Sequence, residues 1–168
     1  MSPDEPVDLR HSDQVALAVR VGLAWIEIRR GASMTAVRDH LFGTGDDALE
    51  QGQMDTLDLL VMQPSWRMSD LADALRVDPS TATRAVHRLV RSGLAERTTS
   101  PEDGRVVIVA ITPAGRARHQ EVDIRRAEVM AFVMAAFSHE ERPQLADMFE
   151  RFVAAVDAFI ATRPTPSS

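Results

Sequence analysis

The chain has 168 residues, 45% hydrophobic and 26% charged, which is typical of one compact domain or two small ones. It has no cysteine, so disulfides, thiolate metal ligands and cysteine nucleophiles are excluded. Nineteen basic residues, all arginine, stand against twenty-five acidic ones, and the net charge of −6 by itself argues against nucleic acid as a partner. The acidic start, Met1–Pro6, lacks the pattern of a secretory signal, and no stretch approaches the roughly 18 apolar residues of a membrane span. We therefore expect a cytoplasmic protein with no membrane partner.

The first part of the chain is predicted to be helical. Apolar residues recur at spacings of 3 and 4 from Ser12 or Asp13 to about Phe42. Gly31 leaves open whether this segment is one kinked helix or two, and the turn-forming segment 43–47 ends it.

Two short helices are expected next. The first runs from Met54 to Met62 and stops before Pro64, because the residue ahead of a proline is pushed out of the helical region. Ser69 is expected to cap the second, whose apolar side is Leu71, Ala72 and Leu75.

A further helix is predicted from Pro79 to Ser92, with both ends specified. Asp78 can accept hydrogen bonds from free backbone N–H groups, and Pro79 at the first helical position has no N–H to lose. Gly93 supplies a left-handed position after the helix, and Leu94 falls where a Schellman cap packs back onto the last turn.

The period then changes to that of a β-hairpin. Segments 94–99 and 106–109 flank the turn formers of 100–104. Thr112 and Pro113 open a long helix to Phe137, and the segment Ser138–Glu141 has the spacing of a capping box for a last helix. The expected fold is therefore mainly α with a small β-hairpin.

The helix beginning at Pro79 has two contrasting sides at about 100° per residue. Ala82, Ala85, Val86 and Leu89 form an apolar side, and no acid lies between Asp78 and Glu96. The opposite side carries arginine, histidine and small hydroxyl residues, which suit the major groove of DNA because arginine bonds guanine bidentately and hydroxyls reach phosphates. An ordinary solvated amphipathic helix is the alternative.

The neighbouring elements favour DNA binding. The helix follows another after a short connection, which is a helix-turn-helix, and the hairpin directly after it makes a winged version. Arg105 at the hairpin tip can enter a narrow minor groove, although a solvated turn charge is the alternative, and Asp103 is expected to fix the turn. The predicted DNA contacts are Ser80, Thr81, Thr83, Arg84, His87, Arg88, Arg91 and Arg105, and the predicted wing-turn residues are Asp103 and Gly104.

Local charge agrees with this placement. Residues 64–118 carry nine arginines and six acids, a net of +3. Residues 1–63 carry five arginines and eleven acids, net −6, and residues 119–168 carry five and eight, net −3. The negative total is thus an average over a basic central segment and two acidic flanks.

These residues resemble the MarR family of winged-helix transcriptional regulators. The resemblance rests on the segments 69–75, 80–89 and 93–97, and above all on Asp103–Arg105 followed by Ile111–Gly115. It implies a DNA-binding regulator, usually a repressor, that reads a palindromic operator as a homodimer. Many members are released from DNA by a small aromatic or anionic ligand, so such an effector is expected as a possible third partner.

The resemblance and the helix order together predict three regions. Residues 1–52 form an N-terminal helical dimerisation segment, 53–112 a winged helix-turn-helix DNA-binding domain, and 113–168 the C-terminal dimerisation helices. The closing helices carry more phenylalanines than one DNA-binding domain can cover, which favours a homodimer over a purely intramolecular core. Trp25, Arg29, Met34, Met54, Met62 and Trp66 suit a ligand pocket, but residues of these types are more often plain core.

Other readings are weaker. The alternative function is a winged-helix protein-interaction module without DNA binding, which the overall acidity permits. An enzyme is not expected, because no paired catalytic carboxylates, phosphate-binding loop or activated nucleophile are evident. No cofactor and no metal site are expected, since the histidines (His11, His40, His87, His119, His139) are scattered and are interpreted mostly as surface residues.

Overall fold

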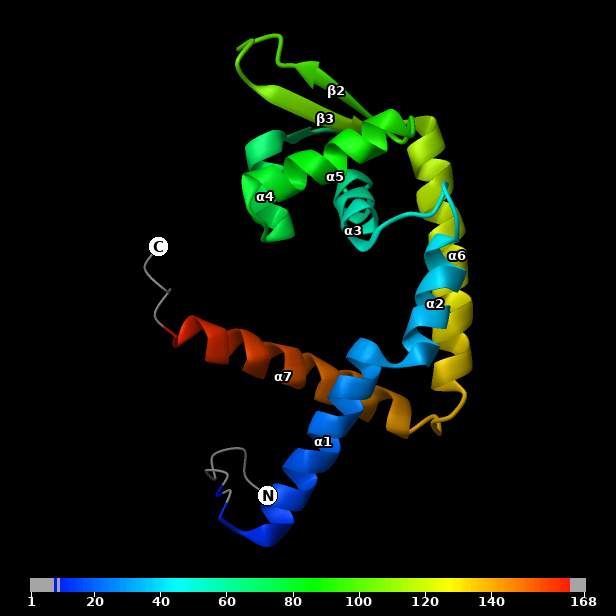
Figure 1. Cartoon of the computed structure of the whole chain (residues 1–168), viewed down its shortest axis with the longest axis vertical. Helices are drawn as coiled ribbons and strands as arrows, with labels where there is room; N and C mark the ends of the chain where they lie inside the picture. The colour runs from blue at the N-terminus through cyan, green and yellow to red at the C-terminus, as the bar shows by residue number, and fades with distance from the viewer. Residues whose placement is uncertain (1–7, 9, 164–168) are drawn as a thin grey trace. The chain divides into compact units, whose positions relative to one another are not determined.

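The structure, a computed structural model, describes residues 8 and 10–163. Residues 1–7, 9 and 164–168 lie outside this range. They include the acidic amino-terminal segment and the outermost ends of the predicted terminal regions. Figure 1 shows the chain in order from blue to red. It forms two compact units, Met1–Arg125 and Arg126–Ser168, and each is described by itself.

The first segment is two helices rather than one. Helix α1 spans Ser12–Arg30 and α2 spans Ala32–Phe42, with Gly31 between them in an extended conformation. A side chain at Gly31 would collide with the side chain and carbonyl oxygen of Glu27. The break therefore sits at the glycine that the sequence left ambiguous.

Helix α3 spans Gln51–Leu60, so it begins three residues before the predicted Met54. The reason is a capping box: the Glu50 side chain accepts from the backbone N–H of Gln53, and the Gln53 side chain accepts from the backbone N–H of Glu50. The helix ends at Leu60, ahead of Pro64 as expected but two residues before the predicted Met62.

Helix α4 spans Met68–Leu75, and the prediction that Ser69 caps it is wrong. The N-cap residue is Arg67, because the chain enters the helix from a short strand, β1, at Trp66–Arg67. Ser69 lies inside the first turn and donates its hydroxyl hydrogen bond to Asp70 instead.

The predicted hairpin is confirmed. Strands β2 (Ala95–Thr99) and β3 (Val107–Ile111) pair antiparallel, with Ala95 opposite Ile111 and Thr99 opposite Val107. The sheet has the order β1-β3-β2, so the unpredicted strand β1 covers the second edge of β3. A strand of two residues has too few positions for an alternating pattern to be visible in the sequence.

Helix α5 spans Pro79–Arg91, so it begins at the predicted residue and ends one residue before the predicted Ser92, which is its C-cap. Gly93 adopts φ 70°, and the backbone N–H of Leu94 donates to the carbonyl of Leu89 at 2.8 Å, while the N–H of Gly93 donates to Val90 at 3.0 Å. These two bonds are those of a Schellman motif.

Helix α6 spans Pro113–Met134 and starts directly against the end of α5. The Thr112 hydroxyl donates to the Gly93 carbonyl at 2.7 Å and accepts from the Gly115 backbone N–H at 3.0 Å. Gly115 is buried, and a Cβ there would collide with the Leu94 carbonyl oxygen and the Ile111 side chain. The Thr–Pro–x–Gly segment therefore joins the two helices at a place where only glycine fits.

Two arginines of α6 close the end of α2. Arg118 Nη2 donates to the Phe42 carbonyl at 2.9 Å, and Arg125 Nη1 donates to the Leu41 carbonyl at 3.2 Å. These carbonyls belong to the last turn of α2, where helix geometry leaves acceptors unpaired.

In the second unit, α7 spans Glu141–Ala161. The predicted capping box is present, since the backbone N–H of Ser138 donates to Glu141 at 2.8 Å and the N–H of Glu141 donates to the Ser138 hydroxyl at 3.3 Å. Helix α6 ends at Met134, three residues before the predicted Phe137.

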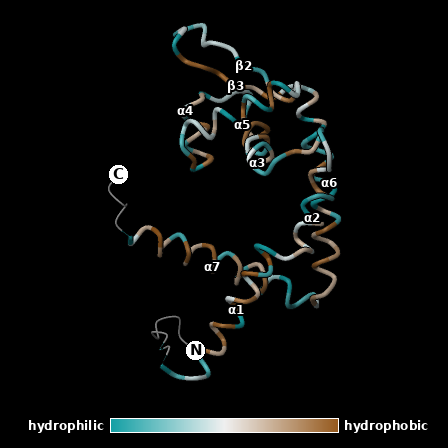
Figure 2. Tube along the Cα trace, in the orientation of Figure 1, coloured by the Kyte–Doolittle hydropathy of each residue, from teal (hydrophilic) through white to brown (hydrophobic). Residues whose placement is uncertain are grey.

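The hydrophobic core lies in the first unit and joins the end of α2, the loop after it, α3, α4, α5, the sheet and one turn of α6. Its buried members are Phe42, Leu49, Met54, Leu57, Leu60, Leu71, Val86, Leu89, Ala95, Val109, Ile111 and Val122. Figure 2 shows that hydrophobic residues also recur along α1 and α7, yet neither helix has a buried residue. Among the described residues, no helix is long and apolar enough to cross a bilayer.

Candidate nucleic-acid interface

Helix α5 presents one buried side and one exposed side. Ala82, Val86 and Leu89 are buried, as the sequence predicted for its apolar side. The three residues 76–78 connect α4 to α5, with Arg76 in the left-handed region at φ 54°. The predicted contacts on the other side are accessible: Ser80, Thr83, Arg84, His87, Arg88 and Arg91 are exposed, and Thr81 is half-buried.

The amino-terminal turn of α5 is held by Asp78. Its carboxylate accepts from the backbone N–H groups of Ser80 and Thr81, both at 3.0 Å, and from both hydroxyls. The hydroxyl of Ser80, then that of Thr81, hold the pKa of the Asp78 carboxyl well below its ordinary value. Arg84 Nη2 in turn donates to the Thr81 hydroxyl oxygen at 3.0 Å. Asp78, Thr81 and Arg84 are therefore linked by hydrogen bonds within the chain itself.

Two further predicted contacts have partners within the chain. The Thr83 hydroxyl donates to the Pro79 carbonyl at 2.7 Å, and Arg88 forms an ion pair with Glu50, the capping residue of α3. A cavity of about 220 Å³ lies beside this pair, lined by Glu50, Gly52, Gln53, Thr81, Arg84, Ala85 and Arg88. Arg88 thus stands at the edge of the exposed side of α5, next to the start of α3.

The wing turn is built as the sequence predicted for Asp103. Its side chain accepts from the Arg105 backbone N–H at 2.9 Å, and its carbonyl accepts from Val106 at 2.9 Å. Gly104 lies in open space. Arg105 is exposed at the tip, and the turn leaves its guanidinium accessible.

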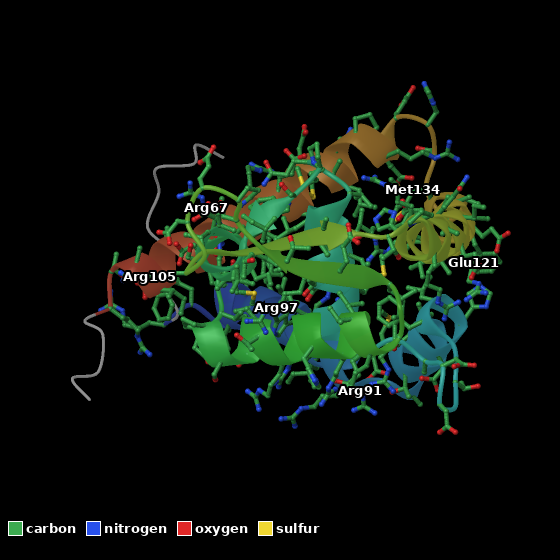
Figure 3. All side chains as sticks on the ribbon, turned by 90° about the horizontal axis from the view of Figure 1, so that it is seen from above. Arg67, Arg91, Arg97, Arg105, Glu121 and Met134 are labelled. Atoms are coloured by element: carbon green, nitrogen blue, oxygen red, sulfur yellow. The ribbon has the colours of Figure 1, made fainter. Side chains whose placement is uncertain are left out.

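Two more exposed arginines lie on the sheet, Arg67 on β1 and Arg97 on β2. Figure 3 labels them with Arg91 and Arg105 in a view from above. Arg97 also lines a cavity of about 580 Å³ with Thr98, Thr99 and Val107. The predicted set omitted both, although each belongs to the basic segment of residues 64–118.

One histidine departs from the sequence interpretation. The side chain of His119 is only 14% exposed and lies between Asp58 and Asp123, so the interpretation of the histidines as scattered surface residues is wrong at this position. The cluster was missed because Asp58 is far from the other two residues in the sequence.

Comparison with known sequences places the chain in a family. The MarR family profile matches residues 49–107. The HTH-type transcriptional repressor YetL of Bacillus subtilis (strain 168) is 31% identical over 125 residues, covering 70% of this chain and 73% of that protein. The uncharacterized HTH-type transcriptional regulator YdgJ of the same strain is 30% identical over 103 residues, covering 61% of this chain but only 63% of YdgJ.

Solved structures share the fold. The MarR family transcription regulator SP03579 aligns with a TM-score of 0.72 at 22% identity, covering 90% of this chain and 96% of that one. Streptococcus pneumoniae FabT, solved in complex with DNA, gives 0.64 at 20% identity, covering 90% and 99%. Streptomyces coelicolor PcaV, solved with its natural ligand, gives 0.61 at 22%, covering 90% and 99%. With its helix-turn-helix, hairpin wing and sequence matches, the chain belongs to the MarR family of transcriptional regulators.

Proposed function

We propose that this regulator binds double-stranded DNA with α5 in the major groove and the hairpin tip in the minor groove. The observation that carries the proposal is the exposed arginine side of α5, opposite the buried Ala82, Val86 and Leu89, followed by a wing whose tip exposes Arg105. FabT, which has the same fold, was solved bound to DNA.

Each of these side chains would contact the part of the DNA that suits its chemistry. Arg84 and Arg91 reach base edges or phosphates from the centre and end of α5, with His87 between them. Ser80, Thr81 and Thr83 are small enough to let the helix sit deep in the groove, and Arg88 reaches a phosphate once it leaves Glu50. Arg105 enters the minor groove, where Asp103 and Gly104 set its approach.

The proposed binding form is a homodimer on a palindromic operator. Two copies related by a twofold axis present two α5 helices and two wings, which requires a symmetric site. The proposed interface lies in residues 1–52 and 113–168, flanking the DNA-binding domain 53–112. Its support is the exposed apolar surface of α1 and α7.

Repression, and release by a small aromatic or anionic ligand, complete the proposal. YetL is named a repressor, and PcaV was solved with a ligand. Arg29 and Met34 line a cavity of about 290 Å³ beside α2. The other four residues suited to a pocket do not line this cavity. Met54 is buried in the core, Met62 is 74% exposed and Trp25 is 46% exposed, while Trp66 donates its indole N–H to the Leu59 carbonyl.

The test begins with selection of bound fragments from genomic DNA, followed by titration of the recovered site. Arg84→Ala and Arg105→Ala should each weaken binding about tenfold or more, since one specific arginine contact contributes about 1–3 kcal/mol. Arg151→Ala, an exposed arginine on α7, is the matched control and should bind as the wild type does.

Two results would contradict the proposal. Unchanged binding by both variants would remove α5 and the wing from the interface. Failure to retain any fragment even at low salt, where phosphate contacts are strongest, would leave the protein-interaction module as the function.

A further inference from the structure

A second cluster of chemically active side chains lies outside the candidate DNA interface. Asp58 comes from α3, while His119 and Asp123 come from consecutive turns of α6 at the i, i+4 spacing that places two side chains on one face. One ligand atom from each residue lies within 4.8 Å of those from the other two. Residues 61 positions apart in the sequence are therefore brought together by the packing of α3 and α6 in the first unit.

The histidine ring is held from both sides. Its Nε2 lies 3.0 Å from an oxygen of Asp58, and its Nδ1 lies 3.2 Å from an oxygen of Asp123. A neutral imidazole has one N–H donor and one acceptor nitrogen, whereas each carboxylate offers only acceptors. One of the two contacts therefore needs a positive charge between nitrogen and oxygen, either a second proton on the ring or a cation.

We propose that Asp58, His119 and Asp123 bind a divalent transition-metal ion of the zinc class. A metal bound to Nε2 of His119 would take the facing Asp58 carboxylate as a second ligand, while Asp123 would accept from the Nδ1–H and orient the ring. Ligand atoms around tetrahedral zinc are about 3.3 Å apart, since each bond is about 2.0 Å. The 3.0 Å between His119 Nε2 and the Asp58 oxygen is close to that spacing.

The donor set selects among metals. One imidazole nitrogen with an aspartate carboxylate suits Zn²⁺, Mn²⁺ or Ni²⁺, whereas Mg²⁺ and Ca²⁺ prefer all-oxygen sites. Water completes the coordination, because the two aspartate side chains remain 36% and 48% exposed. The bound ion would link α3, a core helix of the DNA-binding segment, to α6.

The experiment is calorimetric titration of the metal-free full-length protein with ZnCl₂, with MgCl₂ as the comparison cation. We expect one zinc per chain, at least about tenfold weaker binding by Asp58→Asn and by His119→Gln, and little heat from magnesium. His139→Gln removes an exposed histidine outside the cluster and should leave the affinity unchanged. Zinc should also raise the Tm of the wild type but not of the two cluster variants.

Circular dichroism of each variant establishes that it is folded before titration. Absence of zinc binding to the wild type would overturn the proposal and leave a cluster held by contacts among its own three side chains. Zinc binding that both variants retain would place the metal elsewhere and overturn it equally. Because no DNA is present, neither result depends on the proposed operator binding.

Discussion

Helices α5 and α7 both carry apolar residues at helical spacing, yet these side chains are buried in α5 and exposed in α7. The 13 residues of α5 bury three apolar side chains in the core, while the 21 residues of α7 bury none. Along α7, six large apolar side chains remain between 43% and 61% exposed: Met148, Phe149, Val153, Val156, Phe159 and Ile160. The apolar side of α5 thus belongs to the core of the first unit, whereas the apolar side chains of α7 are exposed.

The number of exposed apolar side chains on α7 indicates that this helix has a binding partner. Single exposed hydrophobic residues are normal, but a row of them on one helix marks an interaction site. Burying one such side chain fully contributes about 1.5–3 kcal/mol to the free energy of folding or association. Six neighbouring side chains of this kind therefore form a larger apolar patch than a monomeric protein usually exposes to water. Under the proposed function, a second copy of the chain covers this row.

The largest expected effect comes from breaking the α7 row. The double variant Phe149→Glu/Phe159→Glu places two charges in the proposed interface, and the dimer dissociation constant should rise about 100-fold or more, as for residues central to an interface. Sedimentation equilibrium should then report the monomer mass at micromolar concentration.

Arg151→Glu adds the same charge about 180° around α7 from residue 149 and should leave the dimer intact. A wild-type protein that sediments as a monomer would refute the dimer, and a double variant that stays dimeric would move the interface away from α7.

The next largest effect concerns the stability of the junction between α5 and α6. Gly115→Ala should lower the free energy of unfolding by about 1–3 kcal/mol, because the added methyl group meets the Leu94 carbonyl in a packed junction. Urea denaturation measures the change. Gly52→Ala on α3, where no atom lies within 4 Å of the added Cβ, should change stability by less than about 1 kcal/mol.

A smaller effect concerns the cap of α5. The pKa of Asp78 is lowered in the folded state, so its stabilisation is present above the ordinary carboxyl pKa and is lost as pH falls below it. Denaturation between about pH 5 and pH 3 should therefore show a shallower loss of stability for Asp78→Asn than for the wild type. Asp147→Asn on α7 is the control, because it removes a carboxylate that does not cap α5. If both variants change the pH dependence of stability equally, the effect does not come from the cap.

The smallest expected effect concerns the ion pair between Glu50 and Arg88, which we expect to lower DNA affinity while leaving the fold of the first unit unchanged. Glu50→Gln keeps a side-chain oxygen for the α3 cap but removes the charge that holds Arg88. Affinity for random-sequence DNA at low salt should rise about twofold to fivefold, the range expected for an exposed ion pair. Asp47→Asn removes a loop carboxylate that has no such contact with α5 and measures the general effect of charge; if it raises affinity as much, the ion pair has no specific role.

Sequence reasoning succeeded where local chemistry determines the structure. Asp78, Pro79 and Gly93 defined both ends of α5, and the β-branched run of β3 identified the wing, since caps and strand periodicity depend on near neighbours. It failed at Ser69, where the preceding strand moved the helix start to Arg67. It failed again at His119, because its partner Asp58 is distant in sequence and only the packing of α3 against α6 brings them together.

The exposure and partners of the residues predicted to contact DNA show the same division. The exposed positions of α5 followed from its period, and Arg105 followed from the turn. Arg88 was included without its partner, because Glu50 caps α3 and lies far from Arg88 in the sequence, so only the packing of α3 against α5 brings them together. Arg67 and Arg97 were omitted, since one lies on a strand of two residues and the other was counted only as charge.

The two guanidinium groups that close the end of α2 have a consequence for the order of folding. Arg118 and Arg125 reach the carbonyls of Phe42 and Leu41 across 76 and 84 residues of sequence. Contacts at such separation form slowly, because the intervening chain must first lose its freedom. The last turn of α2 should therefore gain protection from amide hydrogen exchange only when the first turns of α6 do, so two segments far apart in the sequence would behave as one cooperative unit.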